Sequence, residues 1–187
     1  MSKDLRLKLT QKLRADSLVP GVEKELKELI NQSAVPIIEL TRMVDGVLYE
    51  LNNDTVLQQG DSYFIGFKSI EATVGLVLLK TELQLPYITQ KDVGEYIGII
   101  AQGDYPVKYL LSGALAIYIS RICGTKIFDD SCFWSKHHEN DAESFVNSIK
   151  YDLHSPKVLP GVTDDTSLLK NIQIISEEFY NLLISRQ

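Results

Sequence analysis

The chain has 187 residues, of which 44% are hydrophobic and 24% are charged. That length and balance indicate one folded domain spanning residues 1–187, and they exclude a disordered tail, a collagen-like repeat and a coiled-coil rod. Nineteen basic side chains against 25 acidic ones give a net charge of −6, the wrong sign for a protein that neutralises nucleic-acid phosphates or an anionic membrane surface.

The first half of the chain is dominated by β-type patterns. Leucines alternate along the first expected strand, and Asp45-Gly46 is a two-residue hairpin turn between two others. The expected strands are residues 4–10, 37–44, 47–51, 63–67 and 73–79. The periodicity of 73–79 also allows a buried helix. Apolar residues at helical spacing predict an amphipathic helix over 21–32, after the break at Pro20-Gly21.

Helices are expected through most of the second half. Residues 106–123 are apolar almost all round, which predicts a helix buried in the core, with Asp104 as its N-cap and Gly124 just past its end. A helix is also expected after the capping-box pattern at residues 89–92, with its apolar face formed by Val93, Tyr96, Ile97 and Ile100. The remaining expected elements are a short strand at 125–129 and helices at 140–152 and 167–185.

These elements predict an α+β fold, in which helices pack against a mainly antiparallel sheet of about four to six strands. The buried helix 106–123 is expected to lie across that sheet. A doubly wound parallel sheet is the alternative, but it requires helices between successive strands, and the first half of the chain lacks them.

The densest polar segment of the chain is 129–143, but it contains no recognised catalytic or metal-binding motif. His137 and His138 are adjacent, so their side chains point apart in either a helix or a strand, and the spacing of a metal site is missing. Cys132 pairs with one of these histidines as nucleophile and base only if the fold brings them together. We therefore assign no catalytic residue, metal or cofactor, and keep a small hydrolase or metal-dependent enzyme using 129–143 as the alternative function.

The same segment combines carboxylates with aromatic rings, which is typical of a surface that binds a basic protein. Charge speeds the encounter with such a partner, and a buried aromatic anchor holds it. The expected contact residues are Asp129, Asp130, Phe133, Trp134, Glu139, Asp141 and Glu143. The competing interpretation is that Trp134 anchors the loop to the protein's own core.

Residues 113–130 read GALAIYISRICGTKIFDD. This segment resembles a pattern in small bacterial immunity proteins of polymorphic and contact-dependent toxin systems, where an alanine-rich apolar helix passes through a glycine into a short strand ending in Asp, often with a Trp soon after. Trp134 fits that pattern. The resemblance implies an intracellular inhibitor that covers the active site of a toxin, with no catalytic residues of its own.

The remaining features predict a cytoplasmic protein. Cys123 and Cys132 are too few for a disulfide framework, the first residues lack the apolar stretch of a secretory signal, and no run approaches the length of a membrane span. The leading hypothesis is therefore an immunity-type protein that neutralises a cationic toxin domain. A phage or host accessory protein without activity of its own is a further alternative, and the oligomeric state stays open.

Overall fold

The computed structural model describes residues 3–83, 92–103, 105–149 and 157–186. Its strands are β1 (Lys3–Leu9), β2 (Ile38–Val44), β3 (Val47–Glu50), β4 (Ser62–Phe67), β5 (Thr73–Leu83), β6 (Asp92–Ala101), β7 (Ile127–Asp129) and β8 (Glu139–Asn140). Its helices are α1 (Ala15–Ile30), α2 (Pro106–Cys123), α3 (Ala142–Ile149) and α4 (Asp165–Ser185).

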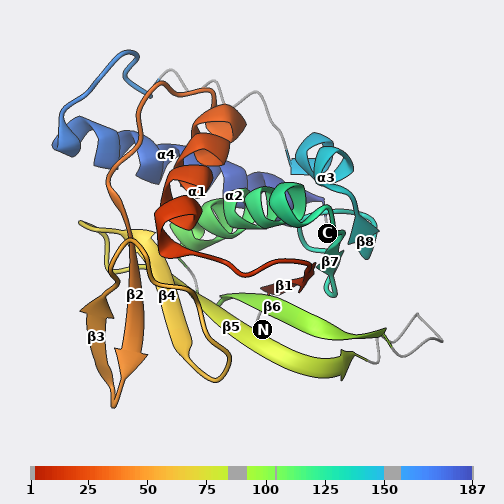
Figure 1. Ribbon diagram of the computed structural model, residues 1–187. Helices are drawn as coiled ribbons and strands as arrows, with labels where there is room; N and C mark the ends of the chain where they lie inside the picture. Colours follow the sequence, from red (N-terminus) through yellow and green to blue (C-terminus); the bar gives the residue numbers. More distant parts are fainter. Residues whose placement is uncertain (1–2, 84–91, 104, 150–156, 187) are drawn as a thin grey trace.

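All eight strands belong to one sheet, with the order β3-β2-β4-β5-β6-β1-β7-β8, and every neighbouring pair is antiparallel. The helices gather on one face of this sheet (Figure 1). The predicted α+β fold with a mainly antiparallel sheet is therefore confirmed, with more strands than expected. Among the described residues, no helix is both long and apolar enough to cross a membrane.

Helix α2 is the centre of the core. It packs between α1 and α4 and lies on β1, β5 and β6, as its nearly continuous apolar surface predicts. Leu115 and Ile119 are completely buried within it. The helix ends at Gly124, whose φ of 62° is in the left-handed region that favours glycine. A Cβ atom on Gly21 would clash with the ring of Tyr118, so glycine allows α1 to approach α2 closely.

The helix expected over residues 93–100 is wrong, because this part of the chain forms strand β6. Ile97 and Ile99 point toward the helices and are fully buried, while Tyr96 and Ile100 lie on the opposite face of the sheet. A central strand with apolar residues on both faces gives the same spacing as the apolar stripe of a helix. The capping-box residues 89–91 and the expected N-cap Asp104 lie outside the described residues.

Helix α1 begins at Ala15, earlier than the expected start near residue 21, and runs through Pro20. Contacts from a distant loop explain the early start. The backbone N–H groups of Ala15 and Asp16 donate to the carbonyl oxygens of Thr55 and Asn53, at 2.9 and 2.8 Å. These bonds satisfy two of the donors that the first turn of any helix leaves without a partner, and the sequence near Pro20 does not reveal them.

Candidate partner-binding surface

The buried carboxylate of Asp129 organises the loop that follows β7. It accepts hydrogen bonds from the backbone N–H groups of Phe133, Trp134 and Ser135 at 3.1, 2.8 and 3.0 Å, and from the Ser131 hydroxyl at 3.2 Å. Burial raises the pKa of Asp129, and the three backbone donors oppose that rise. Asp129 therefore shapes the loop from inside and presents no charge to a partner.

The two aromatic residues expected to anchor a partner are buried in the protein's own core. Phe133 is 4% exposed and Trp134 is 1% exposed. Both rings pack at a tilted angle against the ring of Tyr109 of α2, and the Trp134 indole N–H donates to the Tyr109 carbonyl oxygen at 3.5 Å. The expectation that these rings lie on the surface is corrected, because the bonds to Asp129 turn the loop inward.

The other four predicted contact residues do lie on the surface, but each has a partner within the chain. Asp130 pairs with Arg6 at 2.8 Å, and Glu139 pairs with Lys126. The Asp141 carboxylate accepts hydrogen bonds from the Ser144 N–H at 2.8 Å and its hydroxyl at 3.0 Å, which lower the pKa of Asp141. Glu143 pairs with Arg121 at 2.8 Å. Each of these four acidic residues therefore interacts with another group of the same chain.

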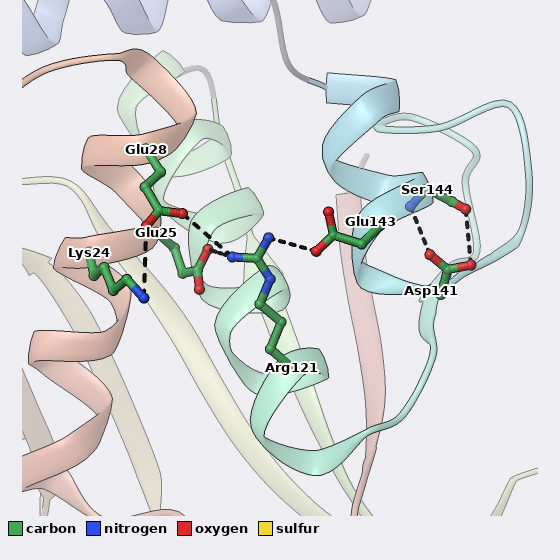
Figure 2. A network of polar contacts seen from close by, with 7 residues as sticks. All are labelled: Lys24, Glu25, Glu28, Arg121, Asp141, Glu143 and Ser144. Atoms are coloured by element: carbon green, nitrogen blue, oxygen red, sulfur yellow. Dashed lines mark hydrogen bonds and ion pairs between the residues drawn. The ribbon is translucent and has the colours of Figure 1, made fainter.

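Figure 2 shows how Arg121 joins three helices. Its guanidinium group on α2 pairs with Glu25 of α1 and Glu143 of α3, and lies 3.6 Å from Glu28. Glu25 is 5% exposed, so its charge depends on this one cation. The hydrogen bond to Glu25, followed by that to Glu143, raises the pKa of Arg121. The cluster therefore holds α3 against the α1–α2 pair.

Cys132 and His138 are brought together, as the alternative enzyme hypothesis requires. The Cys132 Sγ lies 3.3 Å from His138 Nδ1, but the same nitrogen lies 3.2 Å from the Asp129 carbonyl oxygen. A carbonyl only accepts, so that second contact needs a proton on Nδ1, and a protonated Nδ1 cannot take the thiol proton. Burial and the charge of Asp129 also raise the pKa of the Cys132 thiol. This geometry does not favour a nucleophilic cysteine.

No group of three His, Cys, Asp or Glu side chains in the described part of the chain is placed to hold a metal ion. His137 and Cys132 line a concavity of about 350 Å³ whose other charged residues, Lys136 and Arg186, are both basic. This lining has no carboxylate ligand for a divalent cation.

A surface that the sequence analysis did not single out lies at the opposite edge of the sheet. Six of the ten large hydrophobic side chains that are exposed, among the residues the structure describes, lie on or beside the β2–β3 hairpin, with exposed fractions from 36% to 60%. We call them the hairpin surface: Ile37, Met43, Val44, Val47, Leu48 and Tyr49. Figure 1 shows this hairpin extending away from the helices.

The register of the hairpin explains why these side chains are exposed. Met43 lies opposite Leu48 on the face of the sheet that carries no helix, and Val44 lies opposite Val47 on the other face. Both faces of the hairpin tip are therefore apolar. Helix α1 covers β2 only near its start, where Ile38 is buried.

A groove of about 360 Å³ continues the hairpin surface toward α1. The first turns of α1 form one wall, and the start of β2 with the end of β3 forms the other. Asp16, Glu39 and Glu50 are among the residues that line it, and its one basic residue, Lys68, lies 3.9 Å from the Glu50 carboxylate. Ile37 belongs to both the groove and the hairpin surface, so the two meet at the start of β2.

The sequence held a signal for this surface. Apolar residues occupy consecutive positions on both sides of the Asp45-Gly46 turn. Neighbouring residues of a strand point to opposite faces, so in any register one set of these side chains faces away from the core. The hairpin and segment 129–143 lie at opposite edges of an eight-stranded sheet, which places them about 30 Å apart at an inter-strand spacing of about 4.8 Å. They are two separate surfaces.

The chain matches no protein-family model, no curated protein and no solved structure. Its function is therefore inferred from the described residues.

Proposed function

We propose that this chain is an intracellular, immunity-type inhibitor that binds a cationic toxin domain, and that it binds through the hairpin surface. The observation that carries the proposal is the gathering of six exposed apolar side chains on one hairpin. Exposed apolar side chains that gather in one place on a protein mark interaction sites. The groove beside the hairpin gives a partner side chain a place to insert.

Charge supports a basic partner. Residues 37–54 contain four carboxylates and one basic side chain, a local net charge of −3. That basic side chain, Arg42, is already paired with Asp61 at 3.1 Å. Glu39 and Asp45 form no ion pair within the described part of the chain. Their field would speed the approach of a cationic protein, and the gain would fall with added salt.

The resemblance of residues 113–130 to immunity proteins is compatible with this assignment. The segment forms α2, the turn at Gly124 and strand β7, which are parts of the scaffold. In such a protein the scaffold would hold the inhibitor together, while the hairpin would select the partner. The proposal moves the binding site away from 129–143, because Phe133 and Trp134 are buried there.

Co-expression tests this function. Genes for immunity proteins lie beside the genes of their toxins, so the probe is the toxin domain encoded immediately upstream of this gene. We expect wild-type chain to restore growth of cells that express this domain, and Leu48→Lys, which places a positive charge in the centre of the hairpin surface and repels a basic partner, to fail. Ile184→Lys is the matched control, since Ile184 is similarly exposed but lies on α4. The proposal is wrong if no basic toxin domain is encoded there, or if wild-type chain gives no protection.

A further inference from the structure

The outer edge of β3 presents backbone groups that point away from the sheet. Asp45 and Gly46 have φ values of 51° and 80°, the left-handed conformation of a two-residue hairpin turn. In such a hairpin the residues flanking the turn, Val44 and Val47, form a hydrogen-bonded pair, and bonded pairs then alternate along the strands.

This alternation determines which backbone N–H and C=O groups of β3 point away from β2. It places the N–H and C=O of Val47 and Tyr49 toward β2, which agrees with the bond from the Leu51 N–H to the Leu40 carbonyl oxygen further along, at 3.4 Å. The N–H and C=O of Leu48 and Glu50 therefore point outward. In the described part of the chain, β3 is the last strand on its side of the sheet.

Strand β3 has only some of the devices that usually prevent strand pairing, because it is four residues long and ends in Glu50 but carries no lysine or proline. Edge strands of single proteins are commonly guarded by lysine, proline or a bulge. Strand β3 reads Val-Leu-Tyr-Glu, and pairs with β2 without a bulge. Two of these four residues, Val47 and Tyr49, are of types that favour strands, and the strand is already formed, so its outer edge can accept a further strand.

We infer that β3 accepts an extended segment of the basic partner as a ninth strand, bonded to the outward groups of Leu48 and Glu50. This inference rests on the proposed function and specifies how the partner binds. The two faces of the edge differ. Val47 and Tyr49 lie on the face toward the helices, while the other face carries Leu48 and the carboxylates of Glu50 and, on β2, Glu39. The segment that fits alternates apolar residues on the first face with lysine or arginine on the second.

Charge also decides between this occupant and a second copy of the chain. Pairing two β3 edges would bring together two surfaces that each carry a net charge of −3 over residues 37–54. Like charges that face each other across a strand pair oppose it. A basic segment instead gains from the same carboxylates.

The test uses the full chain and two blocked peptides, Lys-Val-Lys-Val-Lys-Val and its counterpart with glutamate in place of lysine. We expect the lysine peptide to slow hydrogen exchange at the amides of Leu48 and Glu50, while the amides of Val47 and Tyr49, already bonded to β2, change little. The glutamate peptide should bind at least about tenfold more weakly, since charge selects the partner.

Two substitutions at one position separate the backbone from the side chain. Leu48→Pro removes an outward N–H without removing a bond to β2, and proline is tolerated on edge strands. It should weaken binding of the lysine peptide by about tenfold or more, whereas Leu48→Ala, which keeps the N–H, should weaken it by about threefold or less. Circular dichroism of both variants verifies that they fold.

Three results would overturn strand addition: equal loss of binding in the two variants, equal binding of the two peptides, or protection of Leu48 and Glu50 that rises with protein concentration alone. The last result would identify a second copy as the occupant. If any of these occurs while the upstream toxin domain still binds in a way that Leu48→Lys abolishes, the proposed function stands and strand addition fails. If the lysine peptide binds as expected but the toxin domain does not, the proposed function fails alone.

Discussion

Met43 and Leu48 face each other across the β2–β3 hairpin, on the face of the sheet that carries no helix, and both are exposed. The next pair, Val44 and Val47, points to the other face and is exposed as well. The described helices cover neither pair. At the far edge of the sheet the arrangement is reversed, because the aromatic residues are buried and the charged ones are paired. The two edges therefore have different roles, with one suited to binding and the other to stability.

The core position of α2 predicts a large loss of stability when one of its buried side chains is shortened. Leu115 is completely buried among other apolar side chains, and Leu115→Ala leaves a cavity. The free energy of unfolding should fall by about 2–5 kcal/mol, measured by urea denaturation. A loss below about 1 kcal/mol would show that α2 is not the centre of the core.

The Arg121 cluster predicts that replacing Arg121 lowers the free energy of unfolding more than replacing the neighbouring Lys24. Arg121→Ala leaves the buried carboxylate of Glu25 without its partner, which should lower the free energy of unfolding by about 3 kcal/mol or more. Lys24→Ala is the matched control, since Lys24 is an exposed lysine 3.8 Å from Glu28, and it should cost less than about 1 kcal/mol. Similar losses in the two variants would contradict the role given to Arg121.

The burial of Trp134 predicts that its removal affects folding. Trp134→Ala should cost about 3–5 kcal/mol, because the ring is packed against Tyr109 and Phe133. Tyr49→Ala, at an exposed aromatic residue of the hairpin surface, should leave stability within about 0.5 kcal/mol of wild type. Thermal denaturation of both variants makes the comparison. A stable Trp134→Ala variant that releases the toxin domain faster would return the binding site to segment 129–143.

The pKa values of two aspartates in that segment are shifted in opposite directions, that of Asp129 upward and that of Asp141 downward. Burial raises the pKa of Asp129, so its contribution to stability is present at low pH and is lost as pH rises through the raised pKa. Hydrogen bonds from Ser144 lower the pKa of Asp141, so its contribution is present above the ordinary value and is lost as pH falls through the lowered pKa. Carboxyl chemical shifts followed by NMR should place the Asp141 midpoint below that of Asp129. The reverse order would mean that the loop differs from the one described.

Much of the fold follows from local patterns, and the differences have identifiable causes. The apolar surface of α2 and the Asp45-Gly46 turn are strong signals, and both elements form as expected. The prediction of a helix at the position of β6 is wrong because apolar residues on both faces of a strand can have the same spacing as the apolar face of a helix. The early start of α1 depends on carbonyl groups of residues 53 and 55, which are distant in sequence.

The candidate site was harder to predict than the fold. Composition draws attention to the charged and aromatic residues of 129–143, but it cannot distinguish a carboxylate that faces solvent from one that accepts three backbone N–H bonds. The tip of the hairpin is exposed because α1 packs against only part of β2. How far α1 reaches along β2 is a property of the assembled sheet and helices, which local sequence patterns do not contain.

The affinity of the upstream-encoded toxin domain for three forms of the chain tests most directly whether the hairpin is the binding surface. Wild type, Leu48→Lys and Leu159→Lys are compared by isothermal titration calorimetry, with circular dichroism to verify folding; Leu159 is exposed like Leu48 but lies outside the hairpin. We predict that Leu48→Lys weakens binding by about tenfold or more, because it repels a basic partner, and that Leu159→Lys leaves it unchanged. Unchanged binding by a folded Leu48→Lys variant, together with loss of binding when Glu139 and Asp141 are replaced by lysine, would contradict the assignment.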